Sequence, residues 1–395
     1  MSKLDELIQR LCPDGVEYKI LSDLFEQFSG MTGVSNKWAE SGNCVFIDYL
    51  NTYSNLKIDT TALKNATVKN LKQTELIQGD ILLTCASETP DECAISSVIE
   101  QTIQNNVFLD DHLFGLRLKP DYKKIINTTF VNYVFHSEFL RKKIRKAVRG
   151  VTRFYISNPA FMKITIPVPP IEVQDEIVRI LDNFTELSAE LSAELNARKK
   201  QYEWYKRHLF ENTDTTIYHL DEISKNCDNQ RKPITSGNRK SGVYPYYGAS
   251  GIVDYVEDYI YDGDYLLISE DGNNLIARST PIAFSISGKN WVNNHAHVLK
   301  FSNYATRRYV EFYLNSIDLS PFITGGAQPK LNQKNLNKID IPLPSQPDQD
   351  RIVSILDRFD ALCNDISTGL PAEIEARQKQ YEYYRDKLLT FKERS

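Results

Sequence analysis

The stretch IPVPPIEVQDEIVRILDNF at residues 166–184 recurs almost unchanged as IPLPSQPDQDRIVSILDRF at residues 341–359. The two copies lie 175 positions apart and align without a gap. A second match joins ARKKQYEWYKRHL (197–209) to ARQKQYEYYRDKL (376–388) at an offset of 179, so one four-residue unit has been gained or lost between them. Self-similarity of this kind predicts a fold built from two copies of one unit.

Each copy also contains a part that has diverged. GDILL (79–83) matches GDYLL (263–267), and DDHLFGLRL (110–118) resembles NNHAHVLKF (293–301). Two copies are too few for a solenoid, which needs at least three repeats. We therefore predict a pseudo-twofold internal repeat, the single-chain counterpart of a dimer.

The parts that stayed alike, 163–213 and 338–395, are each predicted to be a Pro-rich lead-in followed by a long spacer helix. Apolar and aromatic residues recur there at intervals of three and four, the pattern of a coiled-coil seam. Proline holds each lead-in extended before the helix begins. Gly369 and Pro371 interrupt the second copy, so we expect a break or kink there. A continuous helix over 174–210 would measure about 55 Å.

The diverged parts, 17–162 and 214–337, have a different character. They mix short β-branched or aromatic runs with turn signals such as FSGMTG and SEDGNN, and each carries a helical stretch near its end. This mixture predicts two compact α/β domains in a chain of the α+β class. Residues 1–16 are expected to form a separate N-terminal helical segment.

The composition is that of a globular protein. Hydrophobic residues make up 41% and charged residues 25% of the chain, which are ordinary shares. No apolar run reaches the roughly 18 residues of a membrane span, and the start MSKLDELIQR has no apolar core of a secretory signal. The six scattered cysteines form no C-x-x-C motif and indicate reduced thiols. We expect a cytoplasmic protein without a membrane partner.

Charge is unevenly distributed along the chain. The net charge of −5 argues mildly against a nucleic-acid partner, because DNA-binding domains are usually basic. However, residues 139–154, FLRKKIRKAVRGVTRF, hold seven Arg or Lys and no acid, whereas acids concentrate in 172–194 and 348–375. The basic run is either a solvated helix face or a contact to DNA phosphates, and the absence of compensating acids favours DNA. With a weaker second cluster, the candidate phosphate contacts are Arg141, Lys142, Lys143, Arg145, Lys146, Arg149, Arg231, Lys232, Arg239 and Lys240.

The chain has no motif of a nucleotide or cofactor loop. Neither G-x-x-x-x-G-K-[ST] nor G-x-G-x-x-G occurs. SNPAF (157–161) resembles the N-P-P-[FY] loop of adenine methyltransferases, but it lacks the second proline and a companion glycine loop. We interpret SNPAF as the start of a helix.

Candidate catalytic and metal-binding groups are equally weak. His295 and His297 could place two imidazoles on one strand face, but no third ligand is evident, so packing or a polar loop role is favoured. The acidic pairs Asp91/Glu92 and Glu270/Asp271 follow the two GDxLL strands without a lysine at D/E-x-K spacing. We therefore predict no catalytic residue and no metal ligand in this chain.

Aromatic residues cluster at the end of each spacer helix. They either close the core of the helix pair or form a surface that docks a partner, and the sequence leaves both readings open. The residues concerned are Tyr202, Trp204, Tyr205, Tyr381, Tyr383 and Tyr384.

The doubled pattern I-P-[VL]-P-x-x-x-x-Q-D-x-I-V-x-I-L-D-x-F, followed by ARKKQYEWYKRHLF or ARQKQYEYYRDKLLTF, resembles the specificity subunits of type I restriction–modification enzymes. The resemblance covers essentially the whole chain, and YGASGIVDYVEDYIYDGDYLLISEDG (247–272) is also typical of that family's target-recognition domains. It implies two target-recognition domains, 17–162 and 214–337, separated by two long antiparallel coiled-coil helices.

The resemblance also implies a division of labour. Each recognition domain would read one half of a bipartite site in double-stranded DNA, with an unread spacer between the halves. The helices would bind two methyltransferase (modification) subunits, which carry S-adenosylmethionine and methylate adenine, and restriction/translocase subunits that use ATP and Mg would join that complex. This chain would be non-catalytic and hold no cofactor. The repeated tetrapeptide SAELSAEL (188–195) lies within the predicted spacer helix.

Base-edge readers are expected among Arg, Lys, Asn, Gln, Ser and Thr on loops that can enter the major groove. By position, the candidates are Thr152, Arg153, Asn273, Asn274, Arg278, Gln328 and Lys330. The rival hypothesis is a non-enzymatic coiled-coil scaffold without DNA specificity. Net acidity favours the scaffold, whereas the basic run, the divergence of the two domains and the family motif oppose it.

Overall fold

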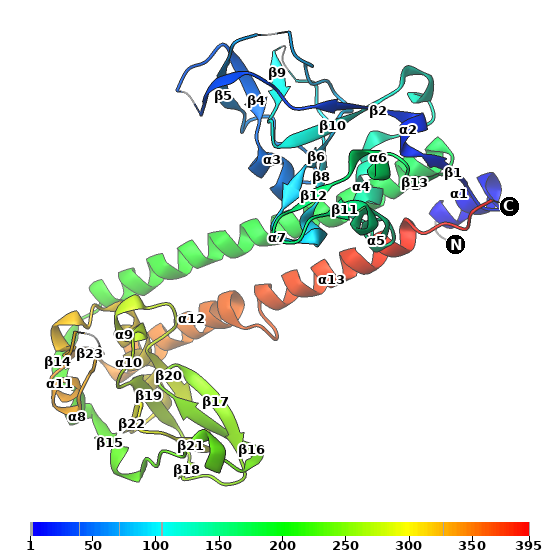
Figure 1. Cartoon of the computed structure of the whole chain (residues 1–395). Helices are drawn as coiled ribbons and strands as arrows, with labels where there is room; N and C mark the ends of the chain where they lie inside the picture. The colour runs from blue at the N-terminus through cyan, green and yellow to red at the C-terminus, as the bar shows by residue number, and fades with distance from the viewer. Residues whose placement is uncertain (1–2, 39, 71, 104–105, 327, 395) are drawn as a thin grey trace. The chain divides into compact units, whose positions relative to one another are not determined.

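The computed structural model describes residues 3–38, 40–70, 72–103, 106–326 and 328–394. The chain divides into two compact units (Figure 1). Unit 1 comprises residues 1–190 and 374–395, and unit 2 comprises residues 191–373. Among the described residues, no helix combines the length and the apolar character that crossing a membrane requires.

Unit 1 is built on two four-stranded sheets. The first has the strand order β2-β10-β6-β8 and is antiparallel throughout, and the second has the order β3-β5-β4-β9 with β4 and β9 parallel. The strands are β2 (Phe25–Ser29), β3 (Val34–Lys37), β4 (Cys44–Ile47), β5 (Lys64–Val68), β6 (Ile81–Thr84), β8 (Ser96–Val98), β9 (Val107–Leu109) and β10 (Leu113–Leu118). Strand β6 contains the last three residues of the GDILL run.

Unit 2 repeats the first sheet strand for strand. In the second sheet three strands correspond, but the fourth lies at opposite edges, because β3 pairs with β5 in unit 1 whereas β18 pairs with β21 in unit 2. Its first sheet has the order β15-β22-β19-β20, and its second has the order β17-β16-β21-β18 with β16 and β21 parallel. The strands are β15 (Ser224–Asn226), β16 (Ser241–Gly248), β17 (Gly251–Val256), β18 (Tyr261–Asp262), β19 (Tyr265–Ser269), β20 (Ala283–Ile286), β21 (Lys289–Val292) and β22 (Ala296–Phe301). The internal repeat and the mixed α/β domains predicted from the sequence are therefore confirmed.

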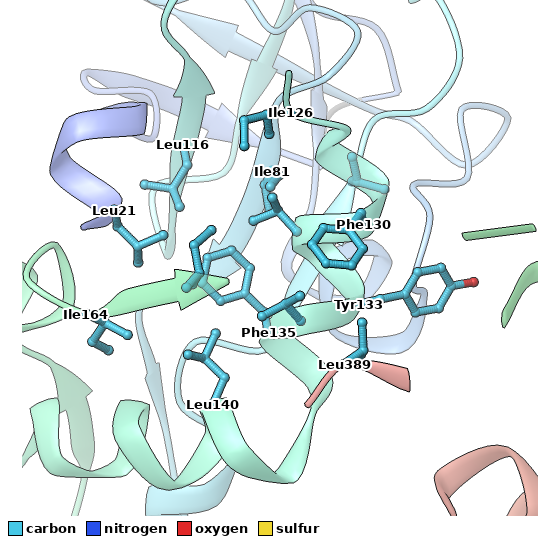
Figure 2. Packing of buried hydrophobic residues seen from close by; sticks show 14 of the residues in the cluster. Leu21, Ile81, Leu116, Ile126, Phe130, Tyr133, Phe135, Leu140, Ile164 and Leu389 are labelled. Carbon is cyan, nitrogen blue, oxygen red and sulfur yellow. The ribbon is translucent and has the colours of Figure 1, made fainter. Parts of the chain in front are cut away.

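Helices cover the first sheet of each unit. In unit 1 the helix on this sheet is α4 (Thr128–His136), against which α5 (Glu138–Ala147) packs, and in unit 2 the corresponding helix is α10 (Tyr304–Ser316). Figure 2 shows the resulting core of unit 1, where Ile81 and Leu116 of the sheet pack with Phe130 of α4. Shorter helices are α1 (Lys3–Leu11), α2 (Leu21–Leu24), α3 (Tyr49–Ser54), α6 (Asn158–Phe161), α8 (Leu220–Ile223), α9 (Asn274–Ala277) and α11 (Gln333–Asn337).

The first spacer helix is continuous and the second is broken. Helix α7 (Ile171–Glu211) has 41 residues, which corresponds to about 60 Å. The second copy splits into α12 (Gln346–Asn364) and α13 (Leu370–Leu388), as Gly369 and Pro371 predicted. The Asp365 carboxylate accepts hydrogen bonds from the backbone N–H groups of Ser367 and Thr368 and so stabilises the intervening turn.

The repeated line makes the same contacts in both units. Each IPxP segment is a strand: β13 (Thr165–Val168) pairs with β1 (Glu17–Ile20), and β23 (Asp340–Pro344) pairs with β14 (Thr215–His219). The Gln174 amide donates to the Pro169 carbonyl at 2.6 Å, and the Gln349 amide donates to the Pro344 carbonyl at 2.8 Å. These hydrogen bonds fix the first turn of each long helix to the strand before it.

Within each unit, the helix of one copy packs against the aromatic end of the other copy. In unit 1, Phe184 of α7 stacks on Tyr384 of α13 with ring centroids 5.6 Å apart. In unit 2, Phe359 of α12 contacts Tyr205 of α7 at 5.3 Å. In unit 1 the phenylalanine comes from the first copy of the repeat and the tyrosine from the second. In unit 2 the phenylalanine comes from the second copy and the tyrosine from the first. Both halves of the repeat are therefore needed to complete either unit.

The last residues of the chain complete unit 1. The backbone N–H of Val16 donates to the Lys392 carbonyl at 2.9 Å, and Arg394 N–H donates back to Val16 at 2.9 Å. Leu389 is fully buried in the core that contains Phe130 (Figure 2). The red C-terminal segment consequently lies beside the blue N-terminal helix α1 in Figure 1.

Candidate nucleic-acid interface

The strongest candidate site is a turn that occurs once in each unit with the same pairing. In unit 1, β11 (Val148–Arg149) and β12 (Phe154–Ile156) enclose the turn, and Arg149 pairs with Tyr155. In unit 2, Thr324 pairs with Lys330. Both partners of the second pair lie 175 positions after those of the first. We refer to residues 149–155 as turn 1 and to the described residues 324–326 and 328–330 as turn 2.

A glycine sets the path of each turn. Gly150 has a φ of +110° and Gly325 a φ of +83°, the left-handed region that side chains other than glycine rarely adopt. A Cβ atom on Gly150 would lie 2.1 Å from the carbonyl oxygen of Arg153, and one on Gly325 would lie 2.5 Å from that of Gln328. The two turns thus share their pairing at the base and their left-handed glycine, and Arg153 and Gln328 lie at equivalent positions.

Each turn pairs with the segment that follows the central strand of its first sheet. Tyr155 of turn 1 pairs with Ala86 of β7 (Ala86–Ser87), just beyond β6. Lys330 of turn 2 pairs with Asp271, just beyond β19. The end of the GDxLL strand therefore fixes the base of each turn, and residues far apart in sequence form one surface.

Beside turn 1 lies a cavity of about 1050 Å³, which we call cleft 1. Thr152 and Arg153 line one part of it, and the stacked rings of Tyr49 and Tyr53 line another. Its remaining lining residues are Cys85, Ala86, Ser87, Glu88, Glu92, Asp111 and His112. The sequence analysis identified Thr152 and Arg153 and weighed Glu92 as a catalytic acid, but it missed the two tyrosines, Ser87 and Glu88. For Ser87 and Glu88, the position after GDILL was the available signal.

The acidic side of cleft 1 is held in place by hydroxyl groups. Glu92 accepts hydrogen bonds from Ser87 at 2.8 Å, Thr89 at 2.9 Å and Tyr53 at 2.9 Å. These bonds, first among them the one from Ser87, lower the pKa of the Glu92 carboxyl. Burial raises the pKa of the Cys85 thiol to about 11. Glu92 is therefore a charged structural group, and Cys85 is not a thiolate at neutral pH.

Two groups of His and carboxylate side chains have the geometry of metal ligands, but each already includes a cation. Asp110, Asp111 and His112 surround the Lys37 ammonium, which lies 3.0 Å from Asp110. In unit 2, Asp228, Glu270 and His297 adjoin the Arg231 guanidinium. His297 lies between two acceptors, Asp228 at 2.6 Å and the Leu331 carbonyl at 2.7 Å. These arrangements suit ion-paired structural networks.

Several of the predicted phosphate contacts in unit 1 point into the protein. Arg141 donates to the carbonyl oxygens of Asp91, Cys93 and Ala94, and burial lowers its pKa to about 10. The Lys143 ammonium lies 4.4 Å from the centre of the Phe139 ring and donates to Thr165. Arg141 and Lys143 are thus engaged within unit 1, and their roles as phosphate contacts stay predictions.

The other cations of the basic run lie on the surface. Lys142 pairs with Glu138 at 2.5 Å, and Arg145 pairs with Asp91. Lys146 and Arg149 are exposed, and no carboxylate among the described residues pairs with either. These two cations are the best placed of the run for a phosphate.

In unit 2, Arg231 is likewise engaged within the protein. Its side chain is 14% exposed and pairs with Glu270 at 2.6 Å and Asp228 at 3.3 Å. Arg239 stacks on Tyr246 at 4.5 Å and pairs with Asp254. Lys240 is exposed and pairs with Glu257, and Lys232 is exposed. Arg231 belongs to the interior network described above.

Some of the predicted base readers of unit 2 form hydrogen bonds or ion pairs within the protein, and others are exposed. Arg278 donates to the Leu314 and Ile317 carbonyls, and the Asn274 amide bonds to Ser279 and Thr280. Arg278 and Asn274 therefore stabilise local structure. Lys330 is half-exposed and pairs with Glu270 at 3.1 Å. Asn273 and Gln328 are exposed.

The aromatic residues at the ends of the spacer helices divide between the two alternatives that the sequence left open, which are core packing and an exposed docking surface. Tyr202 and Tyr381 are 7% and 9% exposed and belong to the cores of unit 2 and unit 1, respectively. Tyr205 and Tyr384 contact Phe359 and Phe184. By contrast, Trp204 is 57% and Tyr383 is 62% exposed. These two residues occupy equivalent positions of the repeat and remain candidates for docking a partner.

Comparison with known proteins gives one consistent family. The family model described as "Type I restriction modification DNA specificity domain" matches residues 13–198 and 212–376. A Haemophilus influenzae protein named as a type I restriction enzyme specificity subunit is 39% identical over 189 residues, covering 47% of this chain and 49% of the relative. The Escherichia coli EcoR124I/EcoR124II specificity subunit is 35% identical over 316 residues, covering 70% of this chain and 76% of the relative.

A solved structure has a similar fold. The S subunit of a type I restriction-modification system from M. genitalium superposes with a TM-score of 0.58, covering 95% of this chain and 96% of that chain. The sequence identity is 15%, so this likeness concerns the fold.

Proposed function

This chain belongs to the type I restriction modification DNA specificity family, and from this membership we propose that it reads a bipartite site in double-stranded DNA. The domain of residues 17–162 reads one half-site, and the domain of residues 214–337 reads the other. The bases between the two half-sites are not read.

The observation that carries this proposal is the pair of equivalent turns. Turn 1 and turn 2 share their strand pairing and their left-handed glycine, yet they display different side chains. Two domains that recognise different half-sites need the same backbone but different side chains at the DNA surface. The side chains that contact base edges discriminate between sequences, whereas the protein backbone only places those side chains.

Partner subunits supply the chemistry in this proposal. Two methyltransferase subunits, which bind S-adenosylmethionine, dock on the spacer helices near Trp204 and Tyr383, and restriction/translocase subunits that use ATP and Mg join the same complex. The chain itself is non-catalytic and acts in the cytoplasm, where DNA and these subunits are present. The exposed aromatic rings support the docking positions, since aromatic residues are enriched in protein interfaces.

A methylome measurement tests the proposal. The chain is co-expressed with the methyltransferase encoded beside its gene in a host that lacks adenine methylation, and every modified adenine is mapped. We expect a split motif with a fixed gap of unread base pairs, present only when this chain is present. The matched control is the methyltransferase expressed alone.

Three results would contradict the proposal: no methylation, a contiguous motif, or methylation that does not depend on this chain. Any of them would favour the alternative of a coiled-coil scaffold without DNA specificity. A double-stranded oligonucleotide that carries the mapped motif should also bind the assembled complex more tightly than one with either half-site scrambled.

A further inference from the structure

Arg153 and Gln328 are the two side chains that the duplicated turn presents at the same position. The carbonyl oxygen of each is the atom nearest to the position of a Cβ on the turn glycine. Both side chains are exposed, and among the described residues neither has a hydrogen-bond or ion-pair partner. The fold therefore holds the backbone at these positions and leaves the end of each side chain free.

Backbone pairing at the base holds each turn. In turn 2, the backbone N–H groups of Thr324 and Lys330 donate to each other's carbonyls at 2.8 and 2.7 Å. In turn 1, the pair of Arg149 and Tyr155 continues into the pair of Tyr155 and Ala86. A fixed backbone lowers the entropy that a reading side chain loses on binding, which favours specific contacts over diffuse attraction.

Thr152 and Asn273 are also exposed, but the sequence aligns Thr152 with Ala327, and Asn273 lies outside the turns. The remaining polar candidates are engaged within the fold. Arg278 and Asn274 bond within unit 2, and Lys330 pairs with Glu270. Glu92 of cleft 1 is held by three hydroxyl groups. Using any of these groups to read a base would break an interaction within the fold, whereas Arg153 and Gln328 lose none.

The chemistry of the two side chains differs in a way that selects different bases. A guanidinium donates two parallel hydrogen bonds, which match the O6 and N7 acceptors of guanine in the major groove. A glutamine amide offers one donor and one acceptor, which match N7 and the N6 amino group of adenine. We propose that Arg153 reads a guanine in the half-site of unit 1 and that Gln328 reads an adenine at the equivalent step of the half-site of unit 2. This inference rests on the proposed function.

Reciprocal exchange tests it, because the chain contains both members of the pair. Arg153→Gln should change one guanine of the first half-site to adenine, and Gln328→Arg should change one adenine of the second half-site to guanine. At each position the preference between the two bases should shift by roughly 10- to 100-fold. All other letters and the length of the gap should stay the same.

The readout uses the assembled complex of this chain with its methyltransferase. Each variant is mapped by its methylome and by selection from a duplex DNA library in which one half-site is fixed and the other is randomised. Selection detects binding even where methylation is lost. Arg153→Lys is a second variant that should keep the preference for guanine, and Lys124→Ala, at an exposed residue of unit 1 outside the turns, should keep every letter.

The outcomes separate this inference from the proposed function. A split motif that depends on this chain but keeps its letters in both exchange variants would overturn the inference alone. The same holds for a wild-type motif without a guanine in one half-site, or for an Arg153→Gln complex that loses the letters of both half-sites. Absence of any split motif with the wild-type chain would instead refute the proposed function.

Discussion

Asp182 and Asp357, which lie 175 positions apart, perform the same structural task in the two units. The Asp182 carboxylate accepts a hydrogen bond from the Tyr133 hydroxyl at 2.6 Å, and that of Asp357 accepts one from the Tyr304 hydroxyl at 2.8 Å. Each carboxylate also faces a cation, Lys57 for Asp182 and Arg308 for Asp357. The repeated ILD triplet thus attaches a long helix to the α/β domain of its unit.

Asp357→Asn is expected to destabilise unit 2 by about 1–3 kcal/mol, because the Arg308 guanidinium, which is 12% exposed, loses one of its three carboxylate partners. The free energy of unfolding can be measured by denaturant titration of the chain. Glu203→Gln, which removes one partner of an exposed pair with Lys206, should change it by less than about 1 kcal/mol. Equal effects of the two substitutions would show that the network around Arg308 contributes no more than a surface pair.

Neutralising Lys146 and Arg149 together should weaken DNA binding similarly for every sequence. Each contact to a phosphate contributes about 0.9 to the slope of log K against log salt. The double alanine variant should therefore lower the magnitude of that slope by about 2 without changing the recognised letters. The same slope is measured for the double variant Lys232→Ala and Lys240→Ala in unit 2. This comparison tests whether exposed cations away from turn 1 contribute as much to the salt dependence of DNA binding. An unchanged slope would place Lys146 and Arg149 outside the DNA interface.

Trp204→Ala and Tyr383→Ala should reduce the binding of methyltransferase subunits and leave the chain folded. Both rings are more than half exposed, so their removal creates no cavity. Mass measurement of the assembled complex should show fewer complexes with two methyltransferase subunits in either variant. Ile366→Ala, also at an exposed apolar residue, is the control and should assemble normally. Normal assembly of both aromatic variants would place the docking surface elsewhere.

His136 should make stability depend on pH. Burial, together with the nearby Arg141 and Arg385 guanidinium groups, lowers its pKa to about 4, whereas a histidine in an unfolded chain titrates near 6.5. Between pH 4 and pH 6.5 the unfolded state binds the proton more readily than the folded state. The contribution of neutral His136 to the free energy of unfolding is therefore fully present above about pH 6.5 and decreases as the pH falls toward 4.

His136→Gln should flatten this part of the profile, since a glutamine amide can still donate to the Ser96 carbonyl that His136 contacts at 2.7 Å. The midpoint of thermal unfolding measured from pH 4 to pH 8 tests this. The same slope in both proteins would assign the acid sensitivity to other groups.

Deleting residues 188–191, one of the two SAEL tetrapeptides within α7, should shorten the helix by about 6 Å and turn its two ends relative to each other by about 40°. The unread gap in the DNA motif should shrink by about one to two base pairs, while both half-sites keep their letters. Methylome mapping measures the gap directly. Glu190→Gln keeps the helix length and should leave the gap unchanged, and a constant gap in the deletion variant would contradict the role of α7 as a spacer.

The tertiary structure alone distinguishes the basic residues from one another. In the sequence, Arg141, Lys146 and Arg149 belong to one run with the same apparent exposure. Arg141 is enclosed because the segment around Asp91 to Ala94 folds over it and offers three carbonyl groups. Arg231 and Arg278 are enclosed in the same way by partners more than 30 residues away. The residues next to a charged side chain in the sequence do not determine which distant loop will cover it.

Features that depend on local sequence were determined by the sequence itself. The helix period, the Pro-rich lead-ins and Gly369 specify α7 and the break between α12 and α13, because backbone conformation responds to neighbouring residues. The repeat specifies two equivalent units, because equal sequences fold alike. Cleft 1, the free ends of Arg153 and Gln328, and the exchange of helices between copies depend on contacts between distant segments, so only the tertiary structure decided them.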